Sequence, residues 1–214
     1  METQRAIRAR RMIRQFDPDR PVDPQALHRI LTLALRAPSA GFSQGWDFVL
    51  LTAAQDREAF WSAATDSDVP DSWLRGVMSA PALVVCCSDK AAYLERYAQP
   101  DKGWTDQDDE RWPVPYWDID VGMAALIMLL VAVDEDLGAL FFGAHVPTHA
   151  AVKNALAIPV DRTIVGIVAL GYPQEKKASG SVRVRRRRPT EEVVHHGRFG
   201  MPYDPVQPPA KASE

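Results

Sequence analysis

The chain has 214 residues, of which 46% are hydrophobic and 25% charged, and its formal net charge is −3. This length is enough to bury a sizeable core, and the composition is typical of a soluble globular protein with one domain, with or without an excursion. The negative charge excludes a general electrostatic attraction to nucleic acid or anionic membranes, so any anion-binding site must be local.

The N-terminus is basic, with a short helix predicted over 2–10 and a cationic segment over 10–16. It lacks the apolar region of a secretory signal. The longest apolar run, residues 123–133, has 11 residues and is too short to cross a bilayer. We therefore expect a cytoplasmic protein that binds neither membrane nor nucleic acid.

The first long helix follows a turn-rich connection. Asp23 is a favoured N-cap residue, and Pro24 suits the first helical position. Apolar residues then recur at helical spacing over 27–35. Pro38 disfavours the helical conformation at Ala37, so we expect the helix to end there.

The next stretch, residues 38–45, is short, rich in hydroxyl groups and contains two glycines. It leads into residues 46–52, whose aromatic and branched apolar side chains predict a strand. A loop of this kind lets the backbone approach a planar ligand closely. Taken alone, it is better explained as an ordinary connection between a helix and a strand.

The middle of the chain is predicted to alternate helices and strands. Cys86 and Cys87 are adjacent in one predicted strand, so their side chains should face opposite sides of the sheet. That placement favours packing residues in a reducing compartment over a disulfide or metal pair. The chain has no CxxC or HExxH spacing, and we predict no metal site. The predicted elements are helices over 54–64, 73–79 and 90–97, and a strand over 82–87.

An excursion at about 88–117 separates these elements from the strongest predicted helix. The excursion contains a polar, proline-punctuated stretch over 99–115, and loops of this length are often lids or binding segments. The helix over 116–137 is apolar around its whole circumference. Such a helix is either central in the fold or completes its burial against a second subunit.

The remaining elements indicate an α/β or α+β fold with a sheet of four or five strands. We expect a single domain over 1–200 and an irregular, proline-containing tail over 201–214. The predicted elements are a strand or turn over 138–143, a helix over 148–156, a strand over 163–170 and a helical turn over 191–195.

Arginines cluster near both ends of the sequence, at Arg10, Arg11 and Arg14 and again over 185–188. In an acidic chain such clusters favour a compact anion such as a phosphate monoester, which guanidinium groups bind bidentately. Either cluster alone would also fit a solvated charged run. Between them there is no Walker, GxGxxG or GxSxG motif, so side chains and loops would have to hold the ligand.

Five motifs occur in order over about residues 8–200 and resemble the nitroreductase-like FMN-dependent oxidoreductases. RRMIRQF at 10–16 resembles the family's RRSxRxF, and PV at 21–22 resembles the PV before its first long helix. APSAGFSQGWDF at 37–48 resembles APSxxNxQPWxF. GIVALGYP at 166–173 resembles the late strand ending in LGYP, and RRP with EEVVH over 187–195 resembles the closing RRPLEEVVH.

The resemblance implies an α+β sandwich, with a mostly antiparallel sheet flanked by helices, in an intertwined homodimer. Two FMN molecules would lie at the subunit interface, with the helix that begins at Tyr116 in the interface core. It also implies that the C-terminal tail wraps the partner subunit.

The resemblance also implies the cofactor contacts. Arg10 would lie near the FMN phosphate, and Arg14 near the pyrimidine edge, where a cation stabilises the negative charge of reduced flavin. Residues of the 38–44 loop would reach FMN from the other subunit, while Met12 and Phe142 could equally be core residues and Arg11 a solvated one. The predicted contacts are Arg10, Arg11, Met12, Arg14, Pro38, Ser39, Ala40, Phe42, Gln44, Phe142, Gly143, Arg185 and Arg187.

Three positions depart from the family pattern. Phe42 replaces the usual asparagine, and Gly45 replaces proline. Gly41 and Phe42 together resemble the loop PSxGFxQPW of the 5,6-dimethylbenzimidazole synthases, which cleave flavin. That subgroup has an aspartate in its RRDVR motif, where this chain has Met12, a thioether without acid–base capacity. We therefore favour hydride transfer over flavin cleavage.

The expected activity is hydride transfer from NAD(P)H through FMN to a small aromatic, quinone or enone acceptor in two half-reactions. We expect no protein nucleophile and no catalytic residue of that kind. Trp104, Trp112 and Tyr116 of the excursion are predicted to stack on the substrate. The alternatives are oxygen-dependent FMN cleavage and a non-catalytic protein that binds flavin or deazaflavin.

Overall fold

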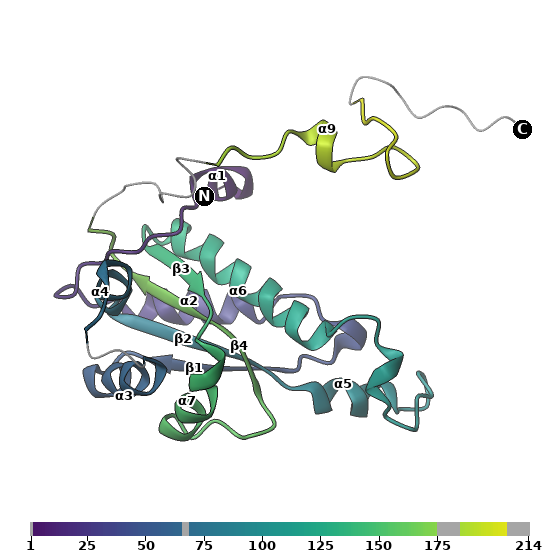
Figure 1. Ribbon diagram of the computed structural model, residues 1–214, viewed down its shortest axis with the longest axis horizontal. Helices are drawn as coiled ribbons and strands as arrows, with labels where there is room; N and C mark the ends of the chain where they lie inside the picture. Colours follow the sequence, from purple (N-terminus) through teal and green to yellow (C-terminus); the bar gives the residue numbers. More distant parts are fainter. Residues whose placement is uncertain (1, 66–68, 175–184, 205–214) are drawn as a thin grey trace, which may run out of the picture. The chain divides into compact units, whose positions relative to one another are not determined.

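A four-stranded antiparallel sheet lies at the centre of the fold (Figure 1). Its spatial order is β1-β2-β4-β3, and all three pairings are antiparallel. This confirms the α+β class and the mostly antiparallel sheet that the sequence predicts. The strands are β1 (Trp46–Leu51), β2 (Ala82–Ser88), β3 (Gly138–Phe142) and β4 (Thr163–Gly171).

The computed structural model describes residues 2–65, 69–174 and 185–204. The chain divides into two compact units, Met1–Lys177 and Ala178–Glu214, which are described separately. The sheet and its helices belong to the first unit. The second contains α9 (Thr190–Val193) and an antiparallel bridge between His195 and Pro202.

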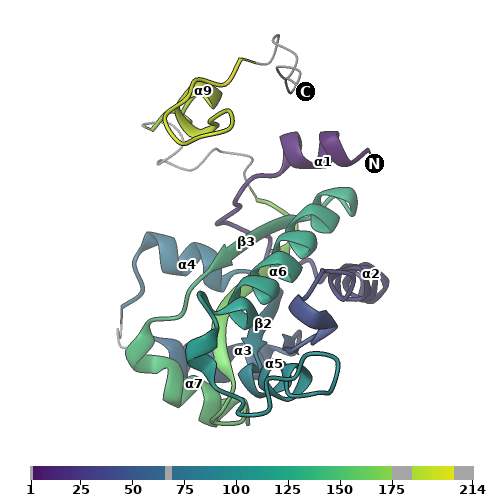
Figure 2. The same cartoon turned by 90° about the vertical axis from the view of Figure 1, so that its right-hand side faces the viewer.

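Helices cover both faces of the sheet, with α2 and α6 on one side and α4 and α7 on the other (Figure 2). Cys86 belongs to the hydrophobic cluster shared with α2 and α6, and Cys87 to the cluster shared with α3, α4 and α7. The prediction that the two side chains face opposite sides is thus confirmed. The helices are α2 (Pro24–Ala34), α3 (Ala54–Ala64), α4 (Ser72–Met78), α6 (Tyr116–Asp134) and α7 (His149–Ala155).

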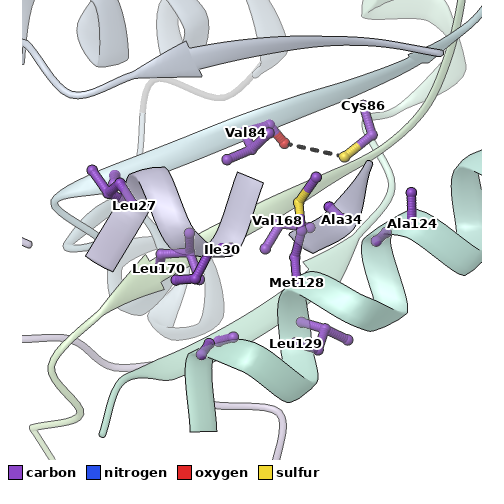
Figure 3. Packing of buried hydrophobic residues seen from close by; sticks show 14 of the residues in the cluster. Leu27, Ile30, Ala34, Val84, Cys86, Ala124, Met128, Leu129, Val168 and Leu170 are labelled. Carbon is purple, nitrogen blue, oxygen red and sulfur yellow. Dashed lines mark hydrogen bonds between the residues drawn. The ribbon is translucent and has the colours of Figure 1, made fainter. Parts of the chain in front are cut away.

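The α2–α6 layer shows how the sequence specifies the core. The Asp23 side chain accepts a hydrogen bond from Gln25 N at 3.1 Å, so the N-cap predicted for α2 is present. Ile30 of α2 and Met128 of α6 are fully buried and pack against the strands (Figure 3). Burial of such apolar side chains supplies the main stabilisation of this layer.

Helix α6 is buried on one face only. Val121 and Met128 are inaccessible to solvent, whereas Ile119 is 42% and Leu126 49% exposed. Among the described residues it is the one helix long and apolar enough to span a membrane, but its buried face packs on the sheet as a core helix does. The structure thus shows α6 as a core helix on its buried face, while burial of its open face against a second subunit stays a prediction.

The cationic N-terminal segment follows α1 (Thr3–Ala9) and runs along the outer edge of β3. Met12 forms a parallel bridge with Ala139, and Ile13 N donates to Ala139 O at 3.0 Å. Phe16 is fully buried, and its N–H donates to Ser79 Oγ at 3.0 Å. The segment that carries the predicted phosphate-binding arginines is therefore fixed to the sheet.

Candidate functional site

The three N-terminal arginines have different environments. Arg14 Nη1 donates to Met12 O at 3.0 Å, and Arg11 Nη1 donates to Arg8 O at 2.6 Å and Arg10 O at 2.9 Å. Arg10 Nη1 is buried and has no hydrogen-bond partner in the described part of the chain. A buried donor without an acceptor is costly, so this nitrogen indicates a place for a ligand oxygen.

Helix α4 fixes the backbone from which Arg14 projects. A Cβ at Gly76 would lie 2.3 Å from Arg14 O, so only glycine allows α4 to pack this closely on the segment. Met12, between Arg11 and Ile13, is half-buried and packs against both hydrophobic clusters. Met12 therefore contributes to the core, as the alternative interpretation of this residue predicts.

The end of β3 borders an aromatic cavity of about 250 Å³. The Phe142 ring stacks on Trp61 at 5.9 Å with an interplanar angle of 6°, and meets the edge of Trp73 at 5.9 Å. Trp61 Nε1 is also buried without a partner among the described residues. By contrast, apart from Gly143 itself and its two chain neighbours, no described residue has an atom within 4 Å of the position a Cβ would take at Gly143. The Phe142 ring is thus engaged in packing, while the Gly143 backbone is open.

The loop that follows α2 is conformationally strained. It contains η1 (Ala40–Phe42), and φ is positive at Gly41 (61°), Phe42 (58°) and Gln44 (52°). Non-glycine residues adopt such values rarely, mostly at functional sites where the surroundings enforce them. Ser39 Oγ accepts a hydrogen bond from Gln44 N at 3.0 Å, and the Phe42 side chain is 74% exposed. Pro38 and Gln44 are exposed as well.

This loop and the arginine segment lie at opposite ends of α6. Ala40 N donates to Asp120 Oδ2 at 2.9 Å, near the start of the helix. Arg11 lines a hollow of about 230 Å³ together with Val133 and Leu137, near its end. At 1.5 Å per residue, the helix from Asp120 to Val133 spans about 20 Å. One chain therefore does not bring the two predicted halves of the cofactor site together.

The aromatic residues of the excursion pack on one another. The Trp112 ring centroid lies 4.5 Å from Tyr97, 5.4 Å from Trp104 and 5.8 Å from Tyr116. Of the predicted substrate residues, Tyr116 has the most accessible side chain. These rings form a small aromatic core for the excursion, whose elements are α5 (Lys90–Tyr97) and η2 (Asp109–Arg111).

Arg185 and Arg187, the other predicted phosphate contacts, belong to the second unit and are exposed there. Reasoning from the sequence missed Asp120, which is 1% exposed and bonds to the loop. An acidic residue directly before a long apolar stretch of the same helix is the signal that could have identified it.

Comparison with known proteins identifies the family of this chain. Residues 7–172 match the sequence model of the Nitroreductase family. The chain belongs to the nitroreductase family. A relative in Archaeoglobus fulgidus, assigned as an NADH dehydrogenase/NAD(P)H nitroreductase, is 28% identical over 180 residues, which cover 82% of this chain and 88% of the relative. A similarly named protein of Methanothermobacter thermautotrophicus is 27% identical over 181 residues, which cover 82% of this chain and 79% of that relative.

Solved structures agree with the nitroreductase fold. A protein of Desulfovibrio desulfuricans, assigned as a nitroreductase and solved in complex with FMN, has a TM-score of 0.69 at 23% identity, covering 93% of this chain and 98% of its own. A nitroreductase-like protein of Streptococcus mutans has a TM-score of 0.71 at 18% identity, and the match covers 90% of this chain and 97% of that protein. The family, its oxidoreductase class and the fold predicted from the sequence are thus confirmed.

Proposed function

We propose that this nitroreductase-family chain is an FMN-dependent oxidoreductase that passes hydride from NAD(P)H to a small aromatic, quinone or enone acceptor. The observation that carries the proposal is the buried, unpartnered Nη1 of Arg10, within a segment fixed to the edge of β3. Family membership and the FMN-bound structural neighbour support it.

The described residues fit FMN. Arg10 has a buried donor available for a phosphate oxygen, and the open backbone at Gly143 allows a flat ring to approach. Bound FMN would supply the ability to take up a hydride and pass on its electrons. The chain supplies binding and electrostatics: the Arg14 guanidinium would stabilise negative charge at the pyrimidine edge. Arg185 and Arg187 remain proposed phosphate contacts that rest on the resemblance.

We also infer that the chain works as a homodimer. The arginine segment and the 38–45 loop are about 20 Å apart along α6, so a site that uses both needs a second chain. The open face of α6, with Ile119 and Leu126, offers apolar surface for that association. Exposed apolar faces of this kind are characteristic of protein–protein interfaces.

The excursion is the proposed contact for the acceptor. Trp104 and Trp112 are engaged with one another, which leaves Tyr116 as the ring best placed to stack on a planar substrate. Trp104 and Trp112 would then act by shaping the excursion around it.

The test is the absorption spectrum of the purified full-length protein with FMN, before and after anaerobic NADPH. We expect a bound yellow chromophore that NADPH bleaches. Arg10→Ala should weaken FMN binding about 10- to 100-fold, since it removes a charge-assisted hydrogen bond. Arg5→Ala is the matched control, because it removes the same charge from an exposed position of α1. A colourless protein that does not take up FMN would overturn the proposal.

Flavin cleavage is disfavoured by Met12. That side chain packs against the core on both sides of the sheet, where the subgroup has its aspartate. Product analysis of the reduced protein after aeration decides between the two reactions, because intact FMN excludes cleavage. Bleaching by NADPH likewise excludes a protein that only binds flavin.

A further inference from the structure

Helix α5 lies against the strained loop through a matched pair of contacts. A Cβ at Gly41 would lie 2.6 Å from the Tyr97 ring, and a Cβ at Gly45 would lie 2.5 Å from the Tyr93 ring. The two tyrosines are one helical turn apart, so they lie on the same face of α5. Each tyrosine thus occupies the space that a side chain would need at its glycine.

Hydrogen bonds tie the same two elements together. Arg96 Nε donates to Gly41 O at 2.9 Å, and both terminal nitrogens of Arg96 bond to Asp101 at 2.7 Å. At the other end of the loop, Asp89 N donates to Gly45 O at 3.0 Å. Both ends of the strained segment are therefore anchored on α5 and its flanking residues.

Asp120 joins α6 to this arrangement. Its Oδ2 accepts hydrogen bonds from Ala40 N at 2.9 Å and from the Tyr93 hydroxyl at 2.8 Å. Tyr93 is fully buried, and burial, followed by the bond to Asp120, raises the pKa of its phenol. The hydroxyl therefore keeps its proton and remains a donor. A buried carboxylate is tolerated only with such donors, so loop, α5 and Asp120 depend on one another.

We propose that α5 and Asp120 form a clamp that holds the 38–45 loop in the strained conformation in which it meets FMN, with Asp120 as the positioning residue. This inference rests on the proposed function for the identity of the ligand. It gives the start of the excursion a role in presenting the loop. The clamp also explains why residue 45 is glycine and not proline, because a proline ring at this position would collide with Tyr93.

Amide hydrogen exchange of the full-length protein without FMN tests the clamp directly. In Asp120→Ala, peptides that contain Ala40 should exchange about 10-fold faster or more, and in Tyr93→Phe about 3- to 10-fold faster. Ser88→Ala is the matched control. It removes a part-buried hydrogen bond of 2.6 Å to Asp118, two residues from Asp120 on α6, and leaves the hydrogen bonds of Ala40 N and the Tyr93 hydroxyl to Asp120 in place. Exchange of the loop should stay unchanged in this variant.

FMN affinity supplies the second readout. Asp120→Ala should raise the Kd for FMN about 10- to 100-fold, and Asp120→Asn should restore it to within a few-fold, because the amide oxygen still accepts from Ala40 N. Loop exchange and FMN affinity that are unchanged in both Asp120→Ala and Tyr93→Phe would overturn the clamp. If loop amides exchanged equally fast in Ser88→Ala, the clamp would also be overturned, because the acceleration would then reflect a general loss of stability.

Two further outcomes are informative. If Asp120→Ala does not fold, Tyr93→Phe decides, because it removes one hydroxyl and keeps the shape of the core. If the wild-type protein binds no FMN, the proposed function fails, whereas the exchange experiment still accepts or rejects the clamp.

Discussion

The separation of the two half-sites along α6 leads to a complementation experiment. One variant is Arg10→Ala, which removes the buried guanidinium. The other is Gly41→Val, which places a branched side chain at a φ of 61° and against the Tyr97 ring. Each homodimer would contain two defective sites. A mixed dimer would contain one doubly defective site and one intact site, because the halves lie about 20 Å apart on each chain and must come from different chains.

The size of the effect follows from this geometry. Equal co-expression gives mixed dimers in about half of the population, so about a quarter of all sites should be intact. The assay is bound flavin per chain and NADPH oxidation, with differently tagged chains to show that mixed dimers form. Each variant expressed alone should show almost no bound flavin and almost no NADPH oxidation. No recovery in purified mixed dimers would refute the two-chain site.

Three other changes have expected results. Leu126→Glu places a charge on the open face of α6 and should convert the proposed dimer to a monomer in size-exclusion chromatography with light scattering, whereas Val160→Glu, at a position 90% exposed, should not. Met128→Ala should cost about 2–5 kcal/mol in urea unfolding, because the side chain is fully buried between α2 and the sheet; a loss below about 1 kcal/mol would contradict that packing. Burial raises the pKa of the Cys87 thiol to about 11, so the folded state should lose stability as pH rises from near 9, where the unfolded thiol ionises, toward 11. In Cys87→Ala, stability should fall less steeply between pH 9 and 11. An unchanged slope of stability against pH would contradict the role given to the Cys87 thiol.

Local chemistry made much of the fold predictable. Asp23 and Pro24 mark the start of α2, and the alternation of side chains in a strand places Cys86 and Cys87 on opposite faces. Helix α6 begins at Tyr116, as predicted, but ends at Asp134, three residues before Leu137. The ends of elements depend on caps and tertiary packing, which periodicity does not describe.

Contacts between distant segments were not predictable in the same way. The sequence gives no sign that Asp120 bonds to Ala40, or that Tyr93 packs on Gly45, because these contacts form only when α5 and α6 meet the loop. The aromatic residues of the excursion are predicted to stack on a substrate, and the structure adds that the Trp112 ring also packs against Tyr97 and Trp104. Composition indicates which side chains are apolar enough to be buried, but it does not identify the residues that they pack against.

The position of the arginine segment has a consequence for biogenesis. Residues 10–16 are synthesised before their bridge partners, Ala139 and Pro173, which come more than 120 residues later in the chain. We therefore expect the Arg10 guanidinium to reach its place only after β3 and the strand that pairs with it, β4, have been made. Loading of the cofactor would then follow translation, and a nascent chain that stalls before β4 would remain flavin-free.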